Sequence, residues 1–99
     1  MKKIELDNLQ SLTFQNILIK TISVFPSGNI ILILNDRSIK IFDKKLSLIQ
    51  QIVNAHDSDI IKISIKDENN FVTCSADISI RFWLKNNNEF ISKNRNKTI

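Results

Sequence analysis

The sequence predicts an all-β fold made of two consecutive four-stranded antiparallel units. The apolar runs are short and rich in isoleucine, a β-branched residue that favours strands over helices. Polar turn segments separate these runs, and no stretch carries a sustained helical stripe of apolar residues with capping residues at its ends. The pattern of the first half of the chain then recurs in the second half.

The first unit, residues 15–53, contains four expected strands. They span residues 17–25, 30–34, 38–42 and 46–53. Pro26 and Gly28 fit a β-turn after the first strand. The run from Ile30 to Leu34 is apolar without interruption, which is typical of a strand that is buried on both faces.

The second unit, residues 54–92, repeats this order. Its expected strands span residues 60–65, 71–75, 80–84 and 89–92. Residues 9–14 form an additional expected strand left from a preceding unit, and residues 1–8 are expected to fray. Residues 93–99 form a basic tail, which is either a disordered end or the start of a further unit.

The two units are an internal repeat. A shift of 41 residues, from position 36 to position 77, places Asp36 on Asp77. Further identities after the same shift are Ile19 with Ile60, Ile22 with Ile63, Ser23 with Ser64, Asn29 with Asn70, Ser38 with Ser79 and Ile39 with Ile80. A four-stranded unit that recurs about every forty residues is typical of the blades of a β-propeller.

The second unit resembles the WD-repeat family. Ala55-His56 stands where that family has its Gly-His pair, and the stretch from Thr73 to Trp83 stands where the family ends its second strand, turns on an aspartate and runs to a terminal tryptophan. The residue after the tryptophan is Leu84, where the family usually has an aspartate. The resemblance implies two consecutive propeller blades, and therefore an incomplete β-propeller.

The first unit is a degraded match. Phe42 replaces the tryptophan, Gln15 stands at the place of the histidine, and Leu32 stands at that of the hydroxyl residue, while Asp43 keeps the final aspartate. Together the two matches cover residues 9–92. A weaker similarity, in segments 22–26, 36–38, 71–75 and 80–83, is to the blades of the phospholipase-A2-activating proteins, whose propeller binds ubiquitin.

The resemblance implies a structural hydrogen-bond network in the second unit. His56 is expected to bond Asp77 and a strand hydroxyl, and the indole of Trp83 closes the network. Thr73 is the preferred hydroxyl, although Ser75 points to the same face of the strand. The same residue types could form the triad of a hydrolase. No glycine-flanked nucleophile turn accompanies them, so the chain is not expected to be an enzyme.

No metal or cofactor is expected. Cys74 is the single cysteine, and strand alternation points it away from His56, so it is expected to pack as a small buried residue. His56 has no second histidine with which to hold a metal. Four acidic residues lie in two separate polar turns and are expected to be solvated: Asp57, Asp59, Asp67 and Glu68.

The bulk composition allows a cytoplasmic or nuclear protein. The formal net charge is +4 and the pI is about 9.4, but the basic residues are scattered. No apolar run is long enough to span a membrane, and the N-terminal residues lack the apolar region of a secretion signal. The alternative function is a small basic β-protein that binds RNA or single-stranded DNA, with Arg81 and Phe82 as the stacking platform.

The leading expectation is a non-catalytic scaffold for protein–protein interaction, a fragment or partial form of a WD-repeat protein, with ubiquitin as a candidate partner. By the resemblance, partners dock at Leu18, Asn35, Asp59 and Ala76. Propellers typically have about 4 to 8 blades, so two blades alone would leave two apolar sheet faces exposed to solvent. The chain is therefore expected to belong to a longer propeller, to assemble with itself or another chain, or to remain a two-sheet sandwich.

Overall fold

The computed structural model describes the backbone of residues 17–98 and the side chains of residues 17–92. This part of the chain forms eight strands and no helix, so among the described residues no helix could cross a membrane. The strands are β1 (Ile19–Val24), β2 (Ile30–Leu34), β3 (Ile39–Phe42), β4 (Leu48–Ile52), β5 (Ile60–Asp67), β6 (Asn70–Ser75), β7 (Ser79–Asn86) and β8 (Glu89–Thr98). The strands expected within residues 17–92 are confirmed. The strand expected at residues 9–14 and the fraying expected at residues 1–8 lie outside the described residues.

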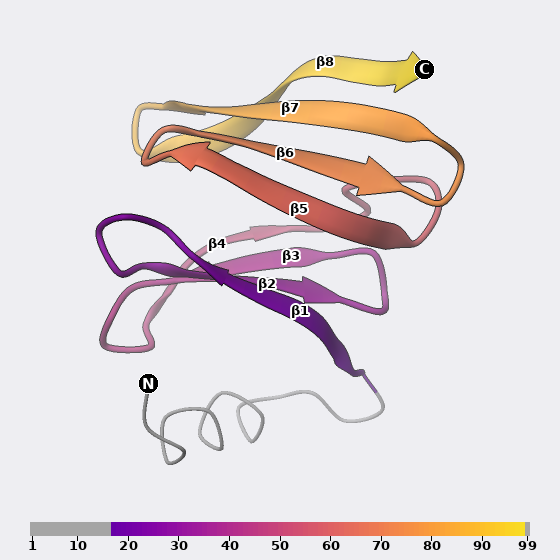
Figure 1. Ribbon diagram of the computed structural model, residues 1–99. Coiled ribbons are helices and arrows are strands. Elements are labelled where there is room, and N and C mark those ends of the chain that lie inside the picture. The colour runs from indigo at the N-terminus through magenta and orange to yellow at the C-terminus, as the bar shows by residue number, and fades with distance from the viewer. Residues whose placement is uncertain (1–16, 99) are drawn as a thin grey trace.

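The strands form two antiparallel sheets, which confirms the predicted all-β class. Sheet A has the order β1-β2-β3-β4 and sheet B the order β5-β6-β7-β8, so each strand pairs with its neighbours in sequence. The sheets lie face to face, with sheet B stacked on sheet A (Figure 1). Neither sheet closes on itself, because β1 and β4 are the edges of sheet A and β5 and β8 those of sheet B.

The turns between the second and third strands of each sheet have the same geometry. Arg37 N donates to Leu34 O at 3.2 Å in sheet A, and Ile78 N donates to Ser75 O at 3.0 Å in sheet B. Both Arg37 and Ile78 have left-handed backbones, with φ of 70° and 68°. The shift of 41 residues therefore relates backbone conformation as well as sequence.

Strand β8 departs from the expected pattern. The sequence predicts a last strand that ends at Ser92, but β8 continues to Thr98, which pairs with Ser79, so that prediction is wrong. The reason is the length of β7, because a β8 that ended at Ser92 would leave the N–H and C=O groups in the first part of β7 unpaired. A longer β8 satisfies these groups. The backbone of residues 93–98 thus belongs to a strand.

The principal core lies between the two sheets. Four aromatic rings form its centre: Phe25 stacks on Phe90 at 5.5 Å, Phe71 stacks on Trp83 at 5.8 Å, and Phe71 meets Phe90 edge-on at 4.9 Å. The buried members of this cluster are Phe25, Ile31, Ile33, Ile39, Ile41, Ala55, Ile60, Phe71, Trp83 and Phe90. Their burial stabilises the stacking of the sheets, since each large apolar side chain contributes about 1.5–3 kcal/mol when buried.

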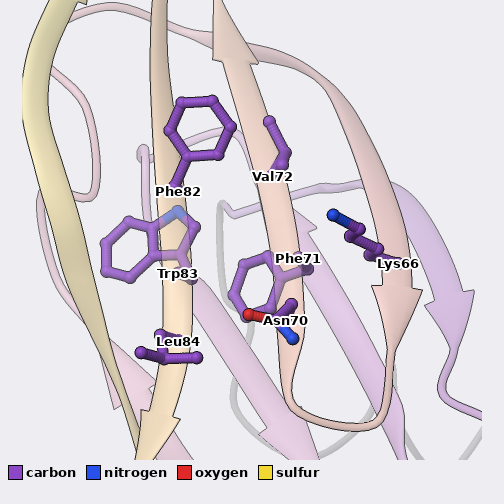
Figure 2. Close-up of a pocket in the computed structure, with 7 residues that line it drawn as sticks. All are labelled: Lys66, Asn70, Phe71, Val72, Phe82, Trp83 and Leu84. Carbon is purple, nitrogen blue, oxygen red and sulfur yellow. The ribbon is translucent and has the colours of Figure 1, made fainter.

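The outer faces of the two sheets differ. On sheet A the side chains of Ile30, Leu32, Leu34 and Phe42 form a second cluster, in which each residue is buried. Every residue of β2 is buried, as the sequence predicts for this strand. The outer face of sheet B is more open, with Phe82 40% exposed (Figure 2). The expectation of solvent-exposed apolar faces therefore does not hold for the centre of sheet A, although Val24 and Leu48 of the same sheet are exposed.

Candidate functional site

The loop from Val53 to Asp59 carries the chain from sheet A to sheet B and is held by both. Ala55 N donates to Arg37 O at 2.9 Å, and the Arg81 guanidinium donates through Nη1 to Ala55 O. Arg37 comes from the turn of sheet A, whereas Arg81 comes from β7 of sheet B. This double attachment fixes the loop so that the next residue, His56, is buried against sheet B.

His56 connects three elements of the second unit. Its Nε2 lies 2.7 Å from Thr73 Oγ1 on β6, and its Nδ1 lies 3.2 Å from Ser79 Oγ at the start of β7. Trp83 Nε1 donates to the same Thr73 oxygen at 3.0 Å. Loop, second strand and third strand are therefore joined by one buried chain of hydrogen bonds.

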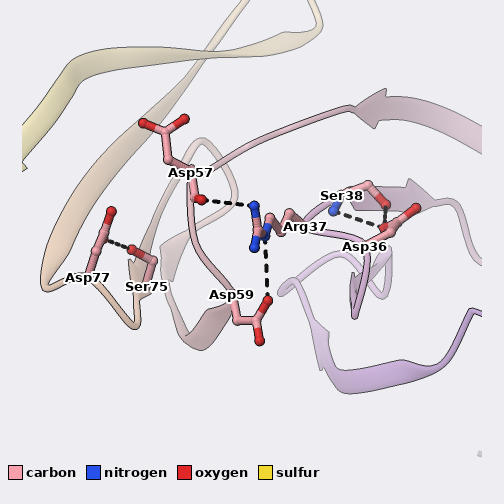
Figure 3. A network of polar contacts seen from close by, with 7 residues as sticks. All are labelled: Asp36, Arg37, Ser38, Asp57, Asp59, Ser75 and Asp77. Atoms are coloured by element: carbon pink, nitrogen blue, oxygen red, sulfur yellow. Dashed lines mark hydrogen bonds and ion pairs between the residues drawn. The ribbon is translucent and has the colours of Figure 1, made fainter.

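Asp77 is the acceptor at the end of this chain. Its Oδ1 accepts from the hydroxyl of Ser75, from Ser79 Oγ at 2.6 Å and from Ser79 N at 3.1 Å (Figure 3 shows the Ser75 contact). These hydrogen bonds, first that from Ser75 and then those from Ser79, hold the pKa of Asp77 far below its usual range. The carboxylate is therefore ionised in the folded chain at neutral pH.

The donors and acceptors fix the direction of the network. The Asp77 carboxylate only accepts, so Ser79 gives its hydroxyl hydrogen to Asp77 and accepts from a proton on His56 Nδ1. The neutral ring then accepts at Nε2 from the Thr73 hydroxyl, whose oxygen also accepts from the indole of Trp83. Burial, followed by the nearby positive charge of Arg81, lowers the pKa of His56, and this agrees with a neutral ring.

Ser75 gives the carboxylate a second hydroxyl donor. Ser75 Oγ lies 2.8 Å from Ser79 Oγ, so the two serines and Asp77 form a triangle of three contacts. Two hydroxyl groups supply only two hydrogens to these contacts. Bonds to a charged oxygen are stronger than bonds between neutral groups, so we assign both hydrogens to Asp77.

The structure places all five predicted network residues in this one cluster, with one difference in connectivity. The sequence predicts a direct bond between His56 and Asp77, but Ser79 stands between them and bonds both. Ser79 was not among the predicted site residues. A signal for it exists, because Ser38 and Ser79 are identical across the repeat.

Sheet A keeps one half of this arrangement. Ser38 donates to Asp36 Oδ1 through its backbone N at 3.1 Å and through Oγ at 2.5 Å, as Ser79 does to Asp77. Leu32 and Phe42, both buried, stand at the places of the threonine and the tryptophan. Gln15, at the place of the histidine, lies outside the described residues.

The buried hydroxyl offers no open route to nucleophilic chemistry. Thr73 is 0% exposed, and its oxygen already contacts His56 and Trp83. Cys74 is a free, partly buried thiol on the opposite side of β6. Among the described residues no three His, Cys, Asp or Glu side chains lie close enough together to hold a metal ion.

The four predicted partner-binding positions lie at one edge of the two sheets. Asn35 N donates to Leu18 O at 3.0 Å in sheet A, and Ala76 N donates to Asp59 O at 2.8 Å in sheet B. Asn35 Oδ1 also accepts from Leu18 N at 3.0 Å. All four residues are exposed, and Leu18 is the most apolar of them, at 68% exposure. The pairs hold equivalent places in the repeat.

Arg37 links the two halves of this edge, a role that the sequence analysis did not predict. Its Nη1 donates to Asp57 O at 2.9 Å, and its Nε lies 3.5 Å from the Asp59 carboxylate (Figure 3). Such an exposed ion pair contributes about 0–1 kcal/mol, so its main effect is to position the loop.

The opposite edge has a link of its own. Glu68, expected to be solvated, accepts from Ser27 N at 2.8 Å and from Ser27 Oγ at 2.7 Å. The expectation is wrong for this residue, because the face-to-face stacking of the sheets brings their two turns together. Gln50 adds a second link, since its side-chain amide bonds both the N–H and the C=O of Phe90 at 2.8 Å.

No family model, curated protein or solved structure matches the chain. The relation to the WD-repeat family therefore remains a prediction, which depends on the residues of the second unit and their spacing.

Proposed function

We propose that the chain is a non-catalytic scaffold for protein–protein interaction, built from two consecutive blades of WD-repeat type that form part of an incomplete β-propeller. The observation that supports this most strongly is the equivalence of the two sheets, which share strand order and edge hydrogen bonds. The buried contacts of His56, Thr73 and Trp83 add to it, because they join loop and strands as the resemblance implies.

The turn edge is the proposed docking surface. Leu18, Asn35, Asp59 and Ala76 are exposed there, while the backbone beneath them is hydrogen-bonded across each sheet. Side chains on a fixed backbone lose less conformational entropy when a partner binds. The buried network uses its polar groups internally, so it supports this surface without taking part in binding.

Two blades do not complete a propeller, so the proposed scaffold requires further sheets. Propellers typically contain about 4 to 8 blades, and the outer face of sheet B is only partly covered. The missing blades would come from a longer form of the protein or from another chain. A cytoplasmic or nuclear location and ubiquitin as a partner complete the proposal, the latter by resemblance alone.

No observation favours the nucleic-acid alternative. Successive residues of a strand point to opposite faces, so Arg81 and Phe82 do not form a joint stacking platform. Arg81 instead donates to Ala55 O at the loop.

Site-specific photo-crosslinking tests the proposal. p-Benzoylphenylalanine in place of Ala76 puts a reactive group on the turn edge, and the same group in place of Ser47, in the turn between β3 and β4, serves as the matched control at the opposite edge. We expect discrete crosslinked proteins at position 76 in cells that express the chain, lost when Asn35→Ala and Asp59→Ala are combined. Equal crosslinking at both positions, or crosslinks that survive the double substitution, would discard this surface.

A further inference from the structure

The outer face of sheet B contains a hollow of about 270 Å³. Its lining residues are Lys66, Asn70, Phe71, Val72, Phe82, Trp83 and Leu84. Figure 2 shows Lys66 on β5 and Phe82 on β7 on either side of Val72 on β6. Val72 and Phe82 are also paired across the two strands, so these two apolar side chains lie side by side in the floor of the hollow.

The repeat shows what fills the equivalent place in sheet A. The 41-residue shift places Phe25 on Lys66 and Ile31 on Val72. Phe25 is buried between the sheets, where it stacks on Phe90 at 5.5 Å and meets the ring of Phe71 edge-on at 6.1 Å. An aromatic ring therefore stands at this position in the first unit, where sheet B covers it, and a lysine stands at the equivalent position beside the hollow.

The rim of the hollow is positively charged. Lys66 lines the hollow and is exposed on β5, whereas Lys62, which is exposed on the same strand, lies outside the lining. The ion pair found among the described residues is that of Arg37 with Asp59, so Lys66 is not held in one, although the carboxylate of Asp67 follows it in the chain. A ligand that combines an apolar ring with a negative charge matches both the floor and the rim.

We propose that this hollow binds an aromatic side chain carried next to a carboxylate on a partner polypeptide. The ring enters between Lys66 and Phe82, and the carboxylate pairs with Lys66. The inference rests on the proposed function, which leaves the outer face of sheet B to a further sheet. It names the chemistry that the polypeptide covering this face would present there, apart from the turn edge. A second copy of the chain does not supply the occupant from its outer sheet A, because Leu32, Leu34 and Phe42 are already buried there.

A small-molecule probe can present only the two groups that the partner needs, an aromatic ring and a carboxylate. The probe is 3-phenylpropionate, titrated into the ¹⁵N-labelled full chain, with uncharged 3-phenylpropanol as the matched compound. We expect saturating amide shifts at Asn70, Val72 and Leu84, and binding of the carboxylate about two- to fivefold tighter than that of the alcohol. Lys66→Gln should remove this preference, whereas Lys20→Gln, an exposed lysine on β1 of the other sheet, should leave it unchanged.

Each outcome bears on the inference. Equal affinity for the two compounds, or shifts confined to the far side of sheet B around Phe90, would overturn it. Concentration-dependent dimerisation that Phe82→Ser abolishes would assign the face to a second copy instead and also overturn it. Crosslinking from position 76 is a separate experiment. If crosslinking is observed but 3-phenylpropionate does not bind, this inference is wrong and the proposed function is still supported.

Discussion

Sheets A and B share a topology but stabilise equivalent faces by different means. In sheet A the side chains of Leu32 and Phe42 pack as hydrocarbon, whereas the repeat places Thr73 and Trp83 at those positions in sheet B. The second pair needs His56 as a partner, because both carry polar groups in a buried site. The same sheet geometry is therefore compatible with an apolar or a hydrogen-bonded interior. In the hydrogen-bonded interior, however, the loss of any one polar side chain leaves a buried group unsatisfied.

The two interiors should respond differently to substitution. Removal of apolar atoms from sheet A costs stability in proportion to the cavity that remains. Removal of one polar group from sheet B leaves each of its buried partners with one hydrogen bond unmade. The following predictions test this difference, starting with the largest expected effect.

The substitution His56→Ala should have the largest effect. It removes the bond of His56 with the Thr73 hydroxyl and its bond with Ser79, while the contacts of these residues with Trp83 and Asp77 remain. At about 1–3 kcal/mol for each bond lost in this buried site, the free energy of unfolding should fall by roughly 2–6 kcal/mol. Urea unfolding followed by the fluorescence of Trp83, the single tryptophan, measures the change. Asp57→Ala in the same loop is the control and should shift stability by about 0.5 kcal/mol or less. Equal midpoints for both variants would contradict the network.

A double-mutant cycle should expose the bond between Thr73 and Trp83. Thr73→Val leaves the indole N–H unpaired and should cost about 1–3 kcal/mol. Trp83→Phe reproduces the residue found at Phe42 in sheet A, so it should cost less in the Thr73→Val background than alone. A coupling energy of about 0.5–3 kcal/mol is expected from urea unfolding of the four proteins. Simple additivity would show that the two groups act independently.

The stability of the fold should depend on pH through His56. Its pKa in the folded chain lies below the ordinary value of 6.5, so the unfolded chain binds the proton more readily. The contribution is complete above pH 6.5 and is lost as the pH falls through the folded-state pKa. The lowered pKa of Asp77 adds a second loss below its ordinary value of 3.8. In urea midpoints measured across this range, His56→Gln should lack the first loss, and a retained loss would assign it elsewhere.

Glycine substitution in the two equivalent turns should change stability by different amounts, and these are the smallest effects predicted here. Ile78 is a β-branched residue in a left-handed backbone and is 58% exposed, so Ile78→Gly should raise stability by about 1 kcal/mol. Arg37→Gly relieves the same strain but loses the bonds to Asp57 and Asp59, so its gain should be smaller. Thermal melts compare the two variants. A larger gain at Arg37 would mean that its side chain does not hold the loop.

The strands could be predicted from the sequence because their pattern is local. Short isoleucine-rich runs between polar turns locate each strand within residues 17–92 to within a few positions. The length of β8 could not be predicted, since it depends on the open edge of β7 rather than on residues 93–98 themselves. The burial of Leu32 and Leu34 on the outer face of sheet A is likewise a property of packing.

Five of the six residues in the network were predictable from the sequence, but Ser79 and the connections between the residues were not. Residue types and spacing place His56 and Asp77 in one cluster, but the gap between them, which Ser79 fills, depends on the path of the loop. The role of Arg37 was not predictable, because sequence does not tell which exposed arginine reaches a neighbouring loop. Contacts between turns of different sheets require the stacking angle, and no short motif encodes it.

Hydrogen exchange at the single indole N–H tests the central claim most directly, because Trp83 alone gives that NMR signal. If sheet B is held by the buried network, the indole hydrogen of Trp83 exchanges only when the fold opens, since it is bonded to a fully buried Thr73. The account predicts an exchange rate close to that of the slowest backbone amides of β6, and rapid exchange in Thr73→Val. An indole hydrogen in the folded wild-type chain that exchanges as fast as in a free peptide would contradict it.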